Sequence, residues 1–458
     1  MTDVYRLKFE DGIIGKLEEY WKIFPIKPIW LRAQGVVFTS SAISKVELND
    51  RLGPIKGNIF VWNLTDSGGY KSPILRALRR LFVTYNKSFL LPARFTIEGL
   101  TEQCTGRHGK EGLEDIVGTP VGVILRDEVS RLIIEKGQKQ YGNLFAFLCE
   151  LWDGWLEGYR TRTFGSEGGI EVYISMCAAS NEHFLKKMDD DDFWIIGLGA
   201  RIELLDDIEI PFKKYDLSFF EDAEDTIKNR ENEVYNEVIV LMKQLINENI
   251  IKALIKPNAA NRWIEYEYKV RQEKEIETDK IRKAQLAKKA QHVLKLAMNY
   301  AASRLNIYSN ILFIDLEDLE RAIADAEEFF NATMRLVRRW RNIQTQKFTN
   351  PPSRIDAATK HKQDYMSWVV KKFVDGIFCA TDVQVEFEAS NLTKVTEVLV
   401  LCVKSKLLEI IANQNEQGSL TNEQYKRFIP KAGFSPRVYK VTEEGRKYVK
   451  SLGEVSHL

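Results

Sequence analysis

The chain has 458 residues, 44% of them hydrophobic and 29% charged, which is the composition of a folded protein with room for about three domains. Its 66 basic and 65 acidic side chains nearly cancel, so overall charge excludes a general attraction to polyanions, and any nucleic-acid surface has to come from local clustering. The scattered cysteines and histidines exclude a zinc spacing, and with no signal-peptide layout and no run of about 18 apolar residues we expect a cytoplasmic protein that does not enter a membrane.

Residues 1–55 are predicted to form a mostly helical cap. Ile14, Leu17 and Trp21 follow the spacing of one helix, and a second helix is predicted for residues 30–45, after two prolines.

Residues 58–82 have the order of a phosphate-binding loop. A short apolar strand is followed by a loop that contains Ser67, Gly68 and Gly69, then by Lys71-Ser72 and an amphipathic helix. In such a loop the backbone N–H groups face an anion, the lysine reaches the β- and γ-phosphates, and the serine hydroxyl binds Mg²⁺.

The sequence of this loop differs from the pattern G-x-x-x-x-G-K-[ST] at two positions. Thr65 and Tyr70 stand where the pattern has glycine. A Cβ atom at position 70 can block the close backbone approach that glycine permits. The pattern alone therefore leaves the function of the loop open.

An acidic motif follows the loop at a distance typical of nucleotide-hydrolysing sites. Residues 121–128 are an apolar strand that ends in Asp127-Glu128. Asp127 is predicted to hold Mg²⁺, and Glu128 to orient or deprotonate the attacking water. The alternative is an acidic first turn of a helix, which the helix dipole favours.

Two further residues are candidates for catalytic roles. Asn181 ends the apolar strand predicted for residues 170–181 and is a candidate γ-phosphate sensor, although it could equally cap the next helix. Arg201 follows a glycine-flanked turn and is a candidate sensor arginine or arginine finger, acting in its own or a neighbouring subunit. The alternative for Arg201 is an ordinary ion pair.

Residues 213–345 are predicted to be a helical domain with long, charged helices. Asp315 is predicted to cap the last of them. Near its end, Arg338, Arg339 and Arg341 surround a tryptophan, which indicates either a contact to nucleic-acid phosphates or cations at a helix C-terminus.

Residues 346–362 are a predicted linker, and residues 363–458 a predicted winged helix-turn-helix domain. The expected order is three helices, two strands of a wing, and a last helix. Lys394 and Thr396 would lie on the recognition helix, and Arg437 and Lys440 on the wing. Such a domain can bind DNA or, alternatively, another protein.

Together these motifs resemble a group of RecA-like P-loop ATPases of plasmids, viruses and integrated elements, related in their core to hexameric helicases. The resemblance rests on the Lys71-Ser72-Pro73 triplet, Asp127-Glu128 and flanking stretches, and covers roughly residues 25–345. It implies an α/β fold with a RecA-like core over residues 56–212, ATP and Mg²⁺ as cofactors, DNA as partner, and a homo-oligomer such as a hexameric ring.

Two functions follow as hypotheses. The first is an ATP-dependent motor or switch that acts on DNA in the replication or maintenance of a mobile element. The second is a non-catalytic DNA-binding initiator or transcriptional regulator whose phosphate loop is degenerate. Thr65 and Tyr70 favour the second; the presence of Lys71 together with Asp127-Glu128 favours the first.

Overall fold

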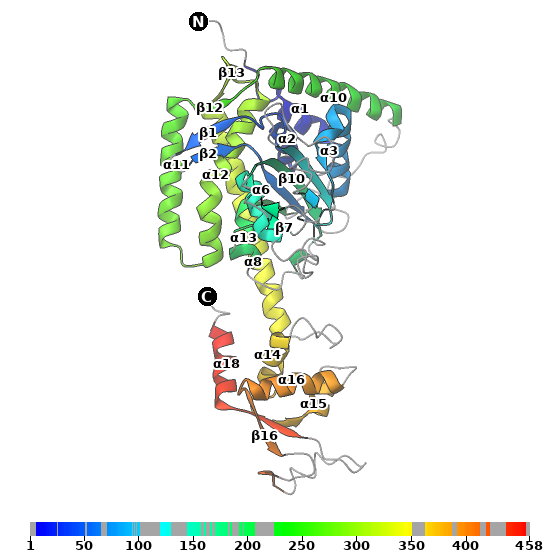
Figure 1. The fold of residues 1–458 in the computed structure, drawn as a ribbon, viewed down its shortest axis with the longest axis vertical. Helices are drawn as coiled ribbons and strands as arrows, with labels where there is room; N and C mark the ends of the chain where they lie inside the picture. The colour runs from blue at the N-terminus through cyan, green and yellow to red at the C-terminus, as the bar shows by residue number, and fades with distance from the viewer. Residues whose placement is uncertain are drawn as a thin grey trace. The chain divides into compact units, whose positions relative to one another are not determined.

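The computed structural model describes residues 6–24, 26–50, 53–65, 71–93, 95, 97, 99–100, 120–129, 144–156, 160–161, 165–166, 170–181, 184–185, 192–195, 197–206, 224–349, 362–386, 392–412, 418–421 and 437–454. These residues belong to two compact units, 1–338 and 339–458 (Figure 1). The first unit thus takes in the predicted cap, the predicted core and nearly all of the predicted helical domain.

A parallel five-stranded sheet forms the centre of the first unit. Its strand order is β11-β3-β10-β5-β4, and each neighbouring pair is parallel. In chain order the strands are β3 (Phe60–Leu64), β4 (Leu90–Leu91), β5 (Val121–Asp127), β10 (Tyr173–Ser180) and β11 (Glu203–Asp206). Strands β3, β5 and β10 are almost entirely buried, as expected for a parallel sheet that is covered on both faces.

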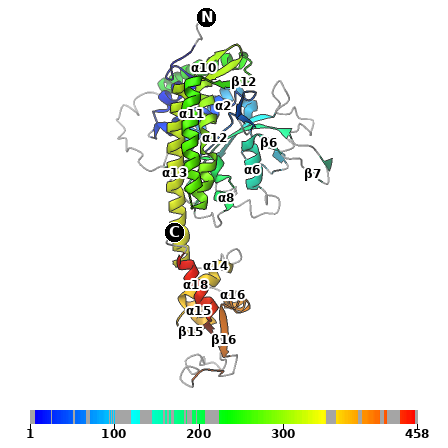
Figure 2. The ribbon, with the colours of Figure 1, turned by 90° about the vertical axis from the view of Figure 1, so that its left-hand side faces the viewer.

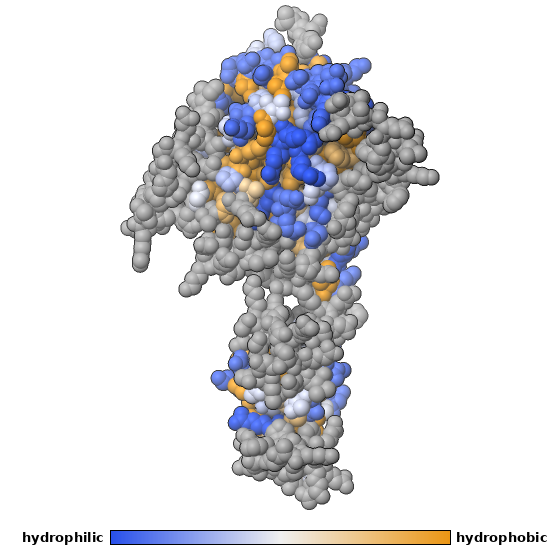
Figure 3. Space-filling view, turned by 90° about the vertical axis from the view of Figure 1, so that its right-hand side faces the viewer, coloured by the Kyte–Doolittle hydropathy of each residue, from blue (hydrophilic) through white to orange (hydrophobic). Residues whose placement is uncertain are grey.

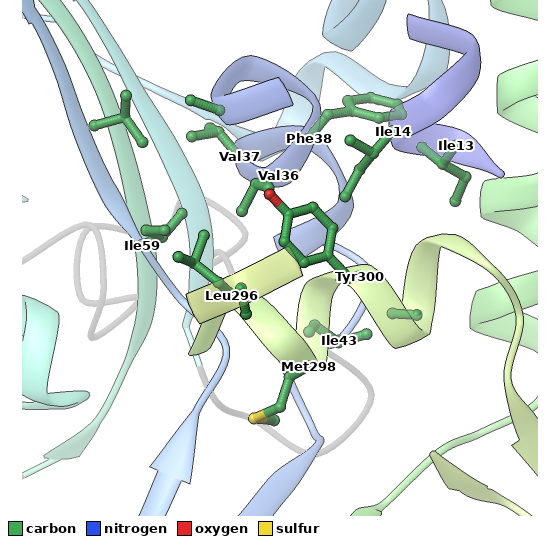
Figure 4. Close-up of a cluster of buried hydrophobic side chains, with 14 of the residues drawn as sticks. Ile13, Ile14, Val36, Val37, Phe38, Ile43, Ile59, Leu296, Met298 and Tyr300 are labelled. Carbon is green, nitrogen blue, oxygen red and sulfur yellow. The ribbon is translucent and has the colours of Figure 1, made fainter. Parts of the chain in front are cut away.

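Helices cover both faces of this sheet. One face packs against α1 (Ile13–Trp21), α2 (Pro28–Ser40), α3 (Lys71–Asn86) and α12 (Lys280–Ser303). Figure 4 shows this core, in which Ile14, Phe38, Ile59 and Tyr300 come together from segments far apart in the sequence. Burying one such side chain contributes about 1.5–3 kcal/mol.

The opposite face is covered by aromatic side chains around α6 (Leu144–Asp153) and α8 (Asp192–Ile195). Trp62 of β3 stacks on Phe193 and contacts Phe184 edge-on, and Phe145 of α6 also contacts Phe193. Because successive strand residues alternate between faces, Trp62 belongs to this cluster while its neighbour Val61 belongs to the core in Figure 4.

A second sheet joins the first part of the chain to residues more than 190 positions later. Its order is β13-β14-β12-β1-β2, with strands β1 (Glu47–Asp50), β2 (Gly53–Lys56), β12 (Lys252–Ile255), β13 (Ile307–Tyr308) and β14 (Ile311–Ile314). The sequence predicted no strand in residues 1–55 or 213–345. These strands are two to four residues long, which is too short for a clear alternation of polar and apolar residues.

Long helices complete the unit: α10 (Glu224–Asn247), α11 (Pro257–Ile276), α12 and α13 (Leu316–Thr349). Figure 2 shows α11, α12 and α13 side by side, and ion pairs such as Lys289–Glu327 and Arg262–Glu320 join them. The predicted cap of α13 is confirmed, since Asp315 and Asp318 accept hydrogen bonds from each other's backbone N–H groups in a capping box.

The remaining described elements of the first unit are small: η1 (Lys87–Phe89), η3 (Gly199–Arg201), and the strands β6 (Trp155–Leu156), β7 (Arg160–Thr161), β8 (Gly165–Ser166) and β9 (Ile170–Glu171). Figure 3 shows hydrophilic and hydrophobic side chains interspersed on one face. None of the helices in the described part of the chain is long and apolar enough to cross a membrane.

The second unit is α+β. Its elements are α14 (Lys362–Lys372), β15 (Ile377–Cys379), α15 (Ala380–Glu386), α16 (Leu392–Lys404), β16 (Leu408–Ala412), β17 (Val438–Val441) and α18 (Glu443–Glu454). The sheet is antiparallel with order β15-β17-β16. The turn predicted at Asp375-Gly376 is present, and β15 follows it directly. The sequence did not predict this strand, because three residues give no strand signal by themselves.

Candidate functional site

Polar side chains gather at the edge of the parallel sheet where the strands end. Here α3 begins with Lys71 and Ser72, and β5 ends with Asp127, which Glu128 follows. The Ser72 hydroxyl lies 3.3 Å from Oδ1 of Asp127, although 55 positions separate the two residues. All four side chains are at least partly exposed.

Strand β10 lies between the strand that precedes the loop and the strand that carries the carboxylates. It ends at Ser180, and Asn181 follows with a partly exposed side chain. In register, Ser180 is beside Leu64 of β3 and Ala179 is beside Asp127 of β5. Asn181 therefore lies at the same edge as the Lys71-Ser72 pair and the acidic pair.

The lysine is held close to the start of the loop. Lys71 Nζ donates a 3.1 Å hydrogen bond to the carbonyl oxygen of Thr65, the residue that follows β3. The Thr65 side chain is buried, and Thr65 is not among the described non-glycine residues with positive φ. A glycine is therefore not required at position 65, since its backbone angles suit any residue. Ser67, Gly68, Gly69 and Tyr70 lie outside the described residues.

Glu128 has an unusual backbone. Its φ is +67°, in the left-handed region that a non-glycine residue rarely adopts and that is often found at functional sites. The Val129 N–H donates to the Ala179 carbonyl at 2.8 Å, which ties the end of β5 to β10 through this turn. The side chain accepts a 2.7 Å hydrogen bond from the Ser180 hydroxyl.

Three residues at this edge were not among the predicted site residues. Ser180 contacts Glu128, and Asp206 at the end of β11 forms a two-bonded ion pair with Arg335 of α13 at 2.8 and 2.9 Å. Asn63 of β3 is fully buried, and within the described structure neither atom of its amide group has a hydrogen-bond partner. The signal for Asn63 was in the sequence, as the one polar residue inside an apolar strand.

Arg201 lies at the opposite edge of the sheet. It precedes β11, which runs parallel to β3, so it belongs to the edge where the strands begin. Its guanidinium donates to Asp153 at 2.7 and 3.3 Å and lies 5.7 Å from the Trp152 ring centroid. The ion pair is thus the role seen here.

The edge where the strands begin is fixed by a buried lysine. Lys295 Nζ of α12 donates to the backbone and side-chain oxygens of Asn58 and to the Trp152 carbonyl, at 2.7 to 3.1 Å. Asn58 in turn donates to the carbonyls of Leu151, Trp152 and Ile174. Complete burial holds the pKa of Lys295 well below its usual range. Asn58 therefore connects α6, β10 and α12 at the edge where the strands begin.

Asn58→Leu is expected to destabilise the first unit by about 2–4 kcal/mol, because it removes the amide donor to three buried carbonyls and the side-chain acceptor of the buried Lys295 ammonium. Urea unfolding followed by tryptophan fluorescence measures this, with Trp152 as a nearby probe. Asn261→Leu on the exposed face of α11 is the matched control and should leave the midpoint nearly unchanged. Equal midpoints for the two variants would contradict the role of Asn58.

Neither a family model nor a curated protein sequence matches this chain.

Metal binding at the site would depend on few protein ligands. In the described part of the chain, no group of three or more His, Cys, Asp and Glu side chains is placed to hold a metal ion. The Ser72 hydroxyl and the Asp127 carboxylate are hard oxygen donors that lie side by side. Mg²⁺ is commonly bound by one or two protein oxygens together with water and substrate phosphates, so this pair fits it.

The predicted DNA-binding residues lie on several elements. Arg338, Arg339 and Arg341 lie on α13, with Arg338 exposed and the other two partly exposed. In the second unit, Arg437 directly precedes β17 and Lys440 lies on it, and both side chains are exposed. The other two predicted residues belong to α16. Thr396 is partly buried there, and the Lys394 side chain lies outside the described residues.

The surroundings of Lys440 are not purely basic. In the antiparallel register it lies directly opposite Glu409 of β16, and both side chains are exposed. A carboxylate beside the ammonium group reduces the local positive potential.

Proposed function

We propose that the protein is an ATP-dependent motor or switch that acts on DNA in the replication or maintenance of a mobile element. Its first unit would contain a RecA-like P-loop ATPase core that works in an oligomeric ring, and its second unit would be a winged-helix domain. The observation that carries the proposal is the approach of Ser72 to Asp127, which brings the loop motif and the acidic motif to one place.

The order of the strands supports a ligand site at this position. From β3 the chain moves outward to β4 and back through β5 to β10, and it then crosses β3 to reach β11 on the other side. The connections therefore change direction between β3 and β10. In open parallel sheets, ligands bind at such a switch point, outside the carboxyl ends of the strands. Thr65, Ser180 and Asn181 lie there.

The residues at this edge have the chemistry for a nucleoside triphosphate. The N-terminus of α3 offers a partial positive charge to phosphates, and Lys71 adds a full charge. Ser72 and Asp127 would hold Mg²⁺, which neutralises phosphate charge when bound. Glu128 would accept the proton of the attacking water, and Asn181 would contact the terminal phosphate.

The second unit supports a role in DNA binding by the order of its elements. Helix, strand, two helices, two strands and a final helix is the order of a winged helix, with α16 as the recognition helix and β16–β17 as the wing. The wing carries Arg437 and Lys440 on its exposed side. Phosphate contacts of this kind supply affinity without sequence preference.

Replacing Arg437 and Lys440 together by alanine is expected to weaken DNA binding uniformly across sequences and to reduce the slope of log K against log[salt] by about 2, or about one per phosphate contact. Fluorescence anisotropy with labelled duplex DNA at several salt concentrations measures the slope. Lys447→Ala on α18, also exposed, is the control for a lost surface charge. An unchanged slope in the double variant would remove the wing from the DNA-binding surface.

The second candidate is a DNA-binding initiator or regulator without catalysis. Tyr70 at a glycine position favours it. Turnover of ATP by the purified protein, with and without DNA, separates the two candidates. No turnover under either condition would overturn the ATPase proposal and leave the regulator.

A further inference from the structure

Ser180 contacts both Thr65, where the loop begins, and Glu128 of the acidic motif. It is the last residue of β10 and is fully buried. Its carbonyl oxygen accepts a 3.1 Å hydrogen bond from the backbone N–H of Thr65. Its hydroxyl donates a 2.7 Å hydrogen bond to Oε1 of Glu128.

These contacts form a continuous path across the site. Lys71 Nζ donates to the Thr65 carbonyl, Thr65 N–H donates to the Ser180 carbonyl, and the Ser180 hydroxyl donates to Glu128. The path runs from the predicted phosphate-binding lysine to the predicted base across the end of β10. It uses no side chain between Lys71 and Glu128 except that of Ser180.

The backbone of Glu128 explains why a second support is needed. A residue at φ +67° is held in a sparsely populated conformation, which persists only where the surroundings determine it. The Val129 N–H bond to Ala179 fixes the main chain after the turn. The Ser180 hydroxyl acts on the side chain instead, since its hydrogen bond to Oε1 favours one orientation of the carboxylate.

We infer that Ser180 is a positioning residue for Glu128, which it holds toward the loop while its own carbonyl anchors the start of that loop. This inference rests on the proposed ATPase function. The hydrogen bond to Oε1 restricts the rotation of the carboxylate about its own bonds. Ser180 would thus set the direction of the base.

The experiment compares two serines of the same strand. Ser180→Ala should lower kcat for ATP by about tenfold or more and leave KM nearly unchanged. Ser180→Thr keeps a hydroxyl and should restore part of the lost rate. Ser175→Ala is the control, because Ser175 is equally buried on β10 but bonds to Ser40 and Ile59 at the other end of the strand.

The outcomes separate this inference from the function on which it rests. Ser180→Ala with the kcat of the wild type would overturn the positioning role, as would an equal loss of rate in Ser175→Ala. Wild-type protein without ATP turnover would overturn the proposed function itself. Binding of a fluorescent ATP analogue should be the same in wild type and Ser180→Ala, which shows that the loop is intact.

Discussion

Lys71→Ala is expected to lower kcat/KM for ATP by about 10²–10³-fold, which is the usual cost of removing one charged donor from a phosphoryl-transfer site. Lys71 starts α3 and reaches the Thr65 carbonyl, so its ammonium lies at the point where the phosphates would meet the helix N-terminus.

Turnover and binding should both fail in this variant. Release of phosphate gives the rate, and a fluorescent ATP analogue gives the dissociation constant. Arg80→Ala is the matched control, because Arg80 lies on the same helix in a solvent-exposed ion pair with Glu231 that contributes little. Wild-type turnover in Lys71→Ala would show that the loop is not the nucleotide site.

Glu128→Gln is expected to lower kcat by about 10²–10⁴-fold with little change in nucleotide binding. The amide has the size of the carboxylate and can still accept from the Ser180 hydroxyl, but it cannot take a proton from water. The site would then bind ATP and hold it. This separates Glu128 from Lys71, whose removal should weaken binding as well.

Single-turnover measurements with and without DNA test this expectation. Glu171→Gln provides the control. Glu171 lies on β9, away from the carboxyl edge, is mostly exposed, and pairs with Lys56 of β2. If Glu128→Gln hydrolyses ATP at the wild-type rate, another group acts as base. The acidic pair would then serve the metal or the structure alone.

The parts of the site that the sequence predicted are those with local signals. The buried strand before the loop, the helix that begins at Lys71 and the acidic end of β5 each follow from a pattern within about ten residues, and each of these elements is present. Their meeting at one edge follows because parallel strands end at the same edge.

The parts that it missed depend on distant partners. Arg201 was grouped with the site because the short strand β11, which places it at the opposite edge, gives little signal in four residues. Ser180 was passed over for Asn181, since only the structure shows which of two adjacent polar residues turns toward Glu128. The second sheet was not predicted because β1 pairs with β12, about 200 positions away, and no local pattern indicates such a pairing.

That second sheet has a consequence for biosynthesis. The hairpin β1–β2 and helix α1 emerge from the ribosome early, but β12 and the Ser303 hydroxyl that receives the Ile14 N–H are made much later. At about 5–20 residues per second, the early segments wait for tens of seconds with apolar faces uncovered. The nascent chain is thus expected to need a chaperone, and a fragment that stops at residue 212 should aggregate rather than fold.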